Sequence, residues 1–256
     1  MEPVLSIIIP CYNQGKYIQD AINSVELLPG GYPYEIVIVN DGSTDPSTKD
    51  VLGSLKEKGY KVIDQENEGL SGARNTGITL SRGKYILPLD ADDKIRAAVI
   101  EKAVSILDSN ANTGIVYGDA IYFEEENRVV QAGQYSLRRL LVRNFISACV
   151  VMRKEVWQHA NGYDSNLSAL EDWDLHLSAA ASGWGFHYIP EIFFEYRIRK
   201  DSMIRSHPGL QACRDYIAKK QGPLYRDEFL KTIKIKPRIS VLFTDIWQKI
   251  RGRKIY

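Results

Sequence analysis

The first ninety residues alternate between short apolar runs and longer segments in which apolar residues recur every three or four positions. A short apolar run is typical of a strand buried on both faces, and the recurrent spacing is typical of an amphipathic helix. The pattern predicts strands at 5–9, 35–39, 60–63 and 84–89, and helices at 16–28, 46–58 and 71–80. Because strands and helices alternate, we expect an α/β fold whose parallel sheet carries helices on both faces.

The middle of the chain has a less regular pattern. It predicts a helix over 99–107, a strand that begins at 114, a hairpin over 119–135, a helix over 172–182 and a strand over 186–189.

The C-terminal segment 230–256 differs in charge from the rest of the chain. It holds eight Lys and Arg and one Asp, whereas the whole chain has a net charge of +1. Apolar residues, Trp247 among them, recur in it at helical spacing. A basic amphipathic helix of this kind can lie on an anionic membrane surface or contact a partner. The alternative is a helix docked on the protein's own body with its basic face in solvent.

Composition excludes several classes of protein. The near balance of 33 Lys and Arg with 32 Asp and Glu argues against a nucleic-acid partner for the chain as a whole. Cys11, Cys149 and Cys213 are scattered, so we expect no disulfide framework and no cysteine zinc site, as in a reducing compartment. The N-terminus lacks a basic segment before its apolar run, and no run is long enough to span a membrane. We therefore expect a cytoplasmic protein without a signal peptide.

Polar segments follow the four strands predicted in the first half, at 10–13, 40–45, 67–75 and 90–93. Ligands of open α/β sheets bind beyond the carboxyl ends of the strands, so we expect a site there. The last segment, Asp90-Ala91-Asp92-Asp93, holds three carboxylates that repel one another when buried unless a cation is present. Their hard oxygen atoms suit Mg²⁺ or Mn²⁺. The alternative is an acidic cap at the start of a helix, with Asp93 as the capping residue.

Five segments, in this order, resemble motifs of the family 2 glycosyltransferases: IIIPCYNQGKYI, EIVIVNDGSTD, NEGLSGARNTG, GKYILPLDADD and EDWDL. The resemblance implies the GT-A fold, with a Rossmann-like mixed central sheet, and transfer of a sugar from a nucleotide-sugar with inversion at the anomeric carbon. It implies a nucleotide-sugar-binding half at 1–110, an acceptor-binding and catalytic half of the same domain at 111–225, and the basic tail at 226–256. A dinucleotide-binding dehydrogenase is disfavoured, because the first strand leads into PCYNQG rather than G-x-G-x-x-G.

The resemblance also assigns the residues around the nucleotide base. Pro10 and Tyr12 resemble residues that flank the base, and Asp41 resembles the residue that recognises it. The alternative for Asp41 is a structural role in a turn. Arg74 resembles a residue that borders the base or the phosphates, and its alternative is a surface ion pair.

Two carboxylates of the fourth segment complete the donor side. By resemblance, Asp90 reaches the ribose or the donor sugar, and Asp92 coordinates the metal, Mn²⁺ or Mg²⁺. Such a metal neutralises the departing diphosphate.

The acceptor side is assigned to the segment EDWDL. Asp172 resembles the family's general base, which a helix N-terminus would keep ionised, and Glu171 would orient the base or the acceptor. The alternative is that either acid merely caps the helix. Trp173 and Trp184 are candidates for stacking on a sugar, although buried aromatic residues are commoner.

The segment Tyr196-Arg197-Ile198-Arg199 resembles the family's Y-R-x-H region, which often lies in a loop over the donor. Arg199 replaces the histidine, so we expect no metal-binding histidine at this position. Arg197 and Arg199 are candidate contacts to the diphosphate, because guanidinium pairs well with phosphate. His207 is a candidate metal ligand, with a surface histidine as the alternative.

The resemblance thus implies an inverting, metal-assisted glycosyltransferase of polysaccharide biosynthesis. Its expected donor is a UDP-sugar, with a dTDP-sugar as second choice, and its expected acceptor is a glycan or a lipid-linked glycan, with the tail at the inner membrane surface. The alternatives are a non-catalytic member that binds a nucleotide-sugar or a partner protein, and a nucleotidyltransferase that releases pyrophosphate. The sequence leaves open whether the chain forms a homo-oligomer.

Overall fold

The computed structural model describes residues 2–199 and 208–233. Most of the predicted basic tail, and His207, therefore lie outside the described residues. The chain divides into two compact units with the boundary between Tyr216 and Ile217, and each is described by itself.

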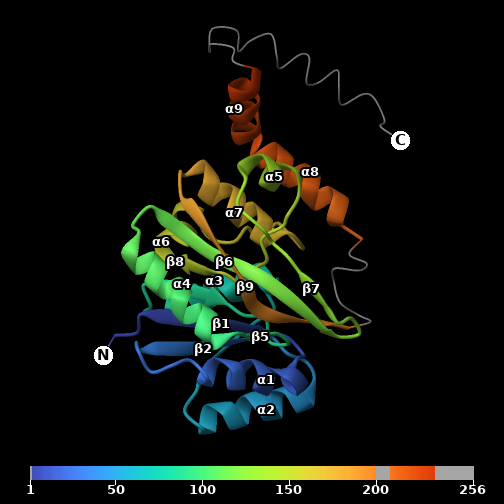
Figure 1. Cartoon of the computed structure of the whole chain (residues 1–256). Coiled ribbons are helices and arrows are strands. Elements are labelled where there is room, and N and C mark those ends of the chain that lie inside the picture. Colours follow the sequence, from blue (N-terminus) through green and yellow to red (C-terminus); the bar gives the residue numbers. More distant parts are fainter. Residues whose placement is uncertain (1, 200–207, 234–256) are drawn as a thin grey trace. The chain divides into compact units, whose positions relative to one another are not determined.

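The first four strands form the parallel part of one sheet, in the order β3-β2-β1-β4. Figure 1 shows β1 and β2 side by side in this sheet. They are β1 (Leu5–Cys11), β2 (Tyr34–Asp41), β3 (Lys61–Gln65) and β4 (Tyr85–Pro88). The helices α1 (Gly15–Glu26), α2 (Pro46–Glu57) and α3 (Gly69–Leu80) connect them in turn. The seven elements predicted for this half are confirmed, with shifts of a few residues at their ends.

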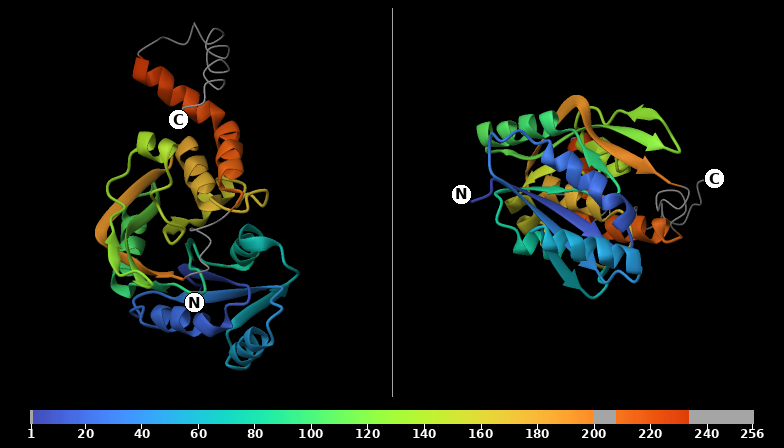
Figure 2. Two further views of the ribbon diagram at one scale, coloured as in Figure 1. Left: turned by 90° about the vertical axis from the view of Figure 1, so that its right-hand side faces the viewer. Right: turned by 90° about the horizontal axis from the view of Figure 1, so that it is seen from below.

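Helices cover both faces of this parallel part, as predicted. All residues of β1 are buried, and Ile7 and Ile9 share a hydrophobic core with Ile22 of α1. Ile8 faces α3, where a Cβ atom added to Gly77 would lie 2.4 Å from its Cγ2, so only glycine allows this close approach. Figure 2 shows β1 and β2 between α3 on one side and α1 and α2 on the other.

The second half adds antiparallel strands, which makes the sheet mixed. The order continues β4-β8-β6-β9-β5, and β7 pairs with β6. Only β6 and β9 are parallel to each other in this half. The strands are β5 (Lys94–Ile95), β6 (Thr113–Glu124), β7 (Arg128–Val130), β8 (Val151–Arg153) and β9 (Gly185–Ile198). The predicted hairpin is confirmed by β6 and β7, and the mixed sheet implied by the resemblance is confirmed as well.

Strand β9 is much longer than the predicted strand over 186–189. The apolar pattern stops at Pro190, but the pairing with β6 passes over it by a shift of register between Ile189 and Ile192. A bulge is where a sheet tolerates proline. The prediction of a loop over 196–199 is therefore wrong for 196–198, because these residues complete β9.

Six further helices complete the described structure: α4 (Ala97–Ser109), α5 (Leu137–Val142), α6 (Lys154–His159), α7 (Glu171–Ala181), α8 (Leu210–Lys220) and α9 (Gly222–Ile233). The helices predicted over 99–107 and 172–182 are confirmed as α4 and α7. Among the described residues, no helix has both the length and the apolar character needed to cross a membrane. All three cysteines are buried free thiols. The division into a donor half and an acceptor half stays a prediction.

Candidate active site

Asp41 is the last residue of β2, and its carboxylate is held at the start of α3. Its Oδ1 accepts hydrogen bonds from Gln65 Nε2 at 2.7 Å and from the backbone N–H of Glu68 at 2.9 Å. The turn that follows β2 is instead supported by Asn40, whose Oδ1 accepts from the backbone N–H of Ser43 at 3.1 Å. Asp41 is thus buried and held in one orientation. The turn, which was the alternative role considered for Asp41, is supported by its neighbour Asn40 instead.

The first polar segment lies beside the second. Pro10 is buried inside β1, whereas the Tyr12 side chain is 46% exposed in the loop that follows. Asn13 adopts a left-handed backbone conformation with φ of 55°, and its Oδ1 accepts from the backbone N–H groups of Thr44 and Asp45. These bonds fix the loop of Tyr12 against the loop after Asp41.

Arg74 lies at the centre of the site and is 1% exposed. Its Nη2 lies 2.6 Å from Asp90 Oδ1, its Nη1 lies 2.5 Å from Glu171 Oε1, and its guanidinium lies over the ring of Tyr163. The surface ion pair considered for Arg74 is therefore a buried double ion pair. Its role as a nucleotide contact stays a prediction. One guanidinium connects the acidic segment after β4 to the acidic start of α7.

The acidic segment after β4 is packed against the end of β9. Asp93 is buried, and its Oδ1 accepts from the backbone N–H of Arg197 at 2.9 Å. The helix-cap alternative for Asp93 is wrong, because α4 begins at Ala97 with Arg96 as its N-cap. The carboxylate of Asp92 lies 3.4 Å from Arg199 Nη2. Burial, together with the charge of Asp90, raises the pKa of Asp92 to about 6.

The donor set of this segment fits a divalent metal that also binds phosphate. No group of three His, Cys, Asp or Glu side chains within the described residues could hold a metal by itself. Mg²⁺, however, is usually bound by one or two carboxylates together with substrate phosphates and water. Asp90 and Asp92 supply such a pair, and the raised pKa of Asp92 indicates a carboxylate that a cation would stabilise in its ionised form.

Arg197 is a structural connector in this arrangement. Its Nη1 and Nη2 each lie 2.7 Å from a carboxylate oxygen, of Glu124 and Asp20 respectively, and its Nε donates to the backbone carbonyl of Asp92 at 2.8 Å. The guanidinium also lies over the ring of Tyr17. All three of its nitrogens are engaged, so a contact with a diphosphate would require it to exchange partners. That contact, and the one considered for Arg199, stay predictions.

The acidic start of α7 places Asp172 beside the buried Arg74. Leu170 is the N-cap, with a φ of 64° that is rare for a residue with a side chain. Asp172 Oδ1 accepts from the backbone N–H of Trp173 at 2.8 Å, and its Oδ2 accepts from Asn144 Nδ2 at 2.9 Å. Neither Glu171 nor Asp172 is the N-cap, although Asp172 does satisfy one N–H of the first turn. Burial raises the pKa of Asp172.

The tryptophans are held by the protein itself. Trp173 is 5% exposed, and its indole N–H donates to the carbonyl of Leu140 at 2.6 Å. This is the buried position considered as its alternative, and stacking on an acceptor sugar would require the ring to leave it. Trp184 donates to His159 Nδ1 at 3.1 Å and stacks on that ring.

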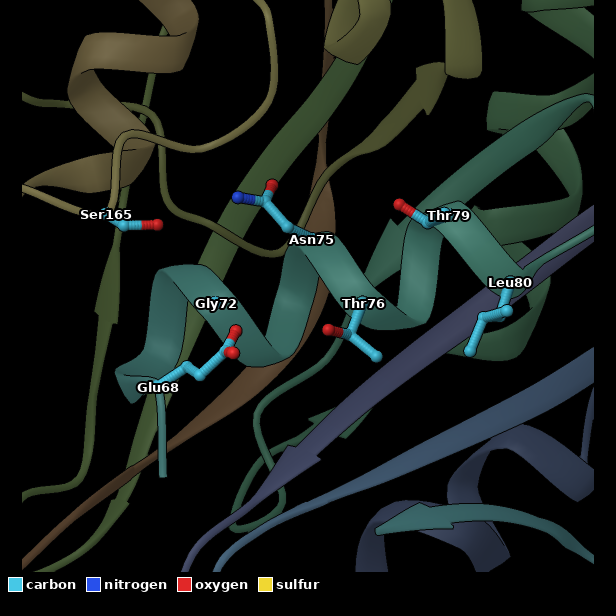
Figure 3. Close-up of a pocket in the computed structure, with 7 residues that line it drawn as sticks. All are labelled: Glu68, Gly72, Asn75, Thr76, Thr79, Leu80 and Ser165. Carbon is cyan, nitrogen blue, oxygen red and sulfur yellow. The ribbon is translucent and has the colours of Figure 1, made fainter. Parts of the chain in front are cut away.

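Two residues of the site were missed by reasoning from the sequence. Asn144 bonds Asp172 from the loop after α5, and Tyr163 lies under Arg74. Neither belongs to a motif, and both meet their partners only through the fold. A separate pocket with a volume of about 340 Å³ lies along α3. Figure 3 draws its lining residues, which include Glu68, Thr79 and Ser165. None of the predicted site residues lines this pocket within the described part of the chain.

Comparison with known proteins gives concordant matches. The model of the family described as glycosyl transferase family 2 matches residues 6–161. TuaG of Bacillus subtilis (strain 168), provisionally described as a teichuronic acid biosynthesis glycosyltransferase, is 27% identical over 79% of this chain and 82% of its own length. Chondroitin synthase of Escherichia coli is 28% identical over 75% of this chain and 28% of its own length.

Solved structures share the fold. The crystal structure of S. aureus TarS 1-349 in complex with UDP-GlcNAc superposes with a TM-score of 0.66 at 20% identity, covering 81% of this chain and 62% of that one. The chain therefore spans less than two thirds of that TarS fragment. At this identity the likeness shows the fold alone, a GT-A-like mixed α/β sheet.

Proposed function

The chain belongs to glycosyl transferase family 2 and is a glycosyltransferase, and from this premise we propose that it moves a sugar from a UDP-sugar to a hydroxyl group of a glycan or lipid-linked acceptor, with inversion. The observation that supports this most directly is the double ion pair of Arg74. It places Asp90, expected on the donor side, and Glu171, expected on the acceptor side, on one buried guanidinium. Asp172 follows Glu171 directly, so the expected base lies next to the expected donor site.

In the proposed reaction, Asp172 accepts the proton of the acceptor hydroxyl. As the hydroxyl oxygen forms its bond to the anomeric carbon, the bond from that carbon to the diphosphate breaks and UDP leaves with the electron pair. The proton passes to a carboxylate oxygen of Asp172. Attack on the face opposite the diphosphate inverts the anomeric centre. Asp172 must be ionised beforehand, and the Asn144 hydrogen bond and the charge of Arg74 favour that form.

Asp90 and Asp92 are the residues that would hold Mn²⁺ or Mg²⁺. When bound, the metal supplies charge neutralisation for the diphosphate. The chain itself holds the segment of these two carboxylates in place. Arg74 pairs with the carboxylate of Asp90, and Arg197 donates a hydrogen bond to the backbone carbonyl of Asp92.

The identity of the donor and the acceptor rests on weaker support. The TarS complex contains UDP-GlcNAc, which favours a UDP-sugar as donor. Asp41 ends β2, and the exposed Tyr12 lies in the loop after β1, which is bonded to the loop that follows Asp41. A base bound at this place could contact both residues. TuaG and chondroitin synthase, by their descriptions, act in the synthesis of polysaccharides, which favours a glycan acceptor. A lipid-linked acceptor and a membrane-surface location rest on the basic segment at 230–256, most of which lies outside the described residues.

A nucleotide panel tests the proposed function. We expect UDP with Mn²⁺ to raise the Tm more than dTDP, GDP or CDP does. A ligand at a hundred times its Kd stabilises the folded state by about 2.7 kcal/mol, so at equal concentrations the nucleotide that binds most tightly gives the largest shift. The measurement is a thermal-shift series with and without Mn²⁺, followed by an assay of UDP release from UDP-sugars. An Asp41→Asn variant should lose the selectivity for UDP. If no nucleotide shifts the Tm, the non-catalytic alternative that binds a partner protein is favoured. Release of pyrophosphate would indicate nucleotidyl transfer.

The pH dependence of kcat tests the state of Asp172. Burial is the largest effect and raises the pKa of this carboxyl, and Asp90 adds to the rise, while Asn144 and Arg74 oppose it. A raised pKa means that the carboxyl takes up a proton at a higher pH than an exposed aspartate, whose pKa is about 3.9. We therefore expect kcat, at saturating donor, to fall at a higher pH than the one at which an exposed aspartate takes up its proton. A kcat that stays constant until the pH at which an exposed aspartate titrates would contradict the assignment of Asp172 as the base.

A further inference from the structure

Asn144 is half-buried in the loop between α5 and β8, and its side chain reaches the expected base. Its Nδ2 donates to Asp172 Oδ2 at 2.9 Å. An ionised carboxylate can only accept hydrogen bonds, so the amide nitrogen of Asn144 must face it, and the amide oxygen must point away. That oxygen, Asn144 Oδ1, is buried and has no hydrogen-bond partner among the described residues.

The segment around Asn144 is tied to α7 and to α5. Before Asn144, the carbonyl of Leu140 in α5 accepts the indole N–H of Trp173, the residue that follows Asp172. After it, the centroid of the Phe145 ring lies 3.6 Å from the guanidinium carbon of Arg139, which is also in α5. Asn144 thus follows a helix that is bonded to α7 next to Asp172, and this restricts where its amide can lie relative to that carboxylate.

We propose that Asn144 is a positioning residue for Asp172: it fixes the plane of the carboxylate and favours its ionised form, without touching either reactant. This inference rests on the proposed function, in which Asp172 is the base. The two carboxylate oxygens are held separately, Oδ1 by the backbone N–H of Trp173 and Oδ2 by Asn144. Each oxygen keeps a second lone pair, which leaves room for the proton of the acceptor. Without Asn144 the terminal torsion of Asp172 loses one of its two restraints, because that torsion is intrinsically broad.

The unpaired oxygen of Asn144 supports a functional rather than a structural role. A buried carbonyl oxygen without a partner destabilises the folded state, and an apolar side chain of similar size would avoid that penalty. Natural chains accept such penalties mainly at functional sites. The left-handed backbone of Leu170, two residues before Asp172, is a second unfavourable feature at the same place.

The test combines two variants with different expected effects on folding. Asn144→Leu removes the unpaired oxygen, which is favourable, and the hydrogen bond to Asp172 Oδ2, which is unfavourable, so its Tm should stay close to that of the parent protein. Asn144→Asp keeps the shape but replaces the donor by a second carboxylate that repels Asp172, so its Tm should fall. In both variants we expect kcat to drop about tenfold to a hundredfold, less than the loss of the base itself, with unchanged affinity for UDP. In both variants the fall of kcat at low pH should begin at a higher pH, because the hydrogen bond that favours the ionised form of Asp172 is lost.

A matched control uses an amide–carboxylate pair outside the site. Asn166 Nδ2 donates to Asp164 Oδ1 at the same distance of 2.9 Å, and Asn166→Asp should leave kcat and its pH profile unchanged. A measurement that needs no turnover is the pKa of the Asp172 carboxyl by carbon-13 NMR, which should rise in Asn144→Leu.

The outcomes separate this inference from the function on which it rests. If Asp172→Asn keeps full turnover, the assignment of the base fails. If Asp172→Asn is inactive while both Asn144 variants keep the parent kcat and its fall at low pH, the role of Asn144 is overturned and the base assignment stands. A loss of kcat in Asn144→Leu that is accompanied by a lower Tm and weaker UDP binding would also overturn it, because a purely structural role predicts that combination.

Discussion

Replacing Asp172 by asparagine is expected to lower kcat by about 10²- to 10⁴-fold while the affinity for the nucleotide-sugar stays nearly unchanged, since this is the usual contribution of a general base. The amide has the shape of the carboxylate, and its carbonyl oxygen can still accept the hydrogen bond from Asn144 Nδ2. The capacity to take the acceptor proton is lost, and so is the acceptor for the backbone N–H of Trp173, which bonds the other carboxylate oxygen. The measurement is kcat for transfer, together with the Kd for UDP and the Tm.

The control is a carboxylate that is hydrogen-bonded but remote from the reaction. Asp108 lies at the end of α4, where it accepts from Lys84 Nζ and Tyr85 Oη, so Asp108→Asn should keep turnover at the parent level. An Asp172→Asn variant with a kcat within a few-fold of the parent protein would show that another group takes the proton. A variant with a normal kcat but weak UDP binding would place Asp172 on the donor side instead.

The sequence predicted the elements whose apolar pattern extends over several residues. The strands β1 and β2 and the helices α1 to α4 and α7 have such patterns, and their bounds came within a few residues. Strands β5 and β8 have two and three residues, too few for any periodicity to register. Strand β9 was cut short at Pro190, because a bulge that accommodates proline leaves no trace in a single strand's pattern.

The motifs name individual residues, whose roles stay predictions, but they do not name the contacts between those residues. The motifs named Asp41, Arg74, Asp90 and Asp172, and the structure places their segments together. The partners of Arg74 could not be predicted, because Glu171 lies 97 positions away and only the fold brings it within 2.5 Å. The same holds for Asn144, which meets Asp172 from a loop without a motif. Contacts of this kind depend on packing between distant elements, which local patterns do not encode.

Arg74→Met is expected to destabilise the folded state by about 3 to 5 kcal/mol and to abolish turnover. Removing one partner of a buried ion pair leaves the other charge uncompensated, and that is the usual magnitude of the loss. In this variant two carboxylates lose their cation. The side chain of Glu171 is 9% exposed, and that of Asp90 is 31% exposed. Most of the loss should therefore come from Glu171. Urea unfolding of the variant and the parent protein measures the free energy, and an unfolding midpoint equal to the parent's would contradict it.

Companion variants separate stability from the arrangement of the site. Glu171→Gln in the Arg74→Met background should recover part of the free energy of unfolding, because it removes the buried carboxylate, but it should not recover turnover. Arg153→Met is a matched control, since this buried arginine donates only to backbone carbonyls, including that of Thr113 at 2.9 Å. It should lower stability and leave the Kd for UDP unchanged.

Arg74→Lys distinguishes the two roles that remain for this residue. Lysine keeps the charge but lacks the planar fork that reaches Asp90 and Glu171 at once. If Arg74 acts by holding these two carboxylates, kcat should fall at an unchanged Kd for UDP. If it contacts the nucleotide, as the resemblance implies, the Kd for UDP should rise as well. The double variant Arg74→Lys/Glu171→Gln, compared with the two single variants, decides between them. A connecting role predicts that the two effects on kcat are strongly non-additive, whereas a nucleotide contact predicts that they add.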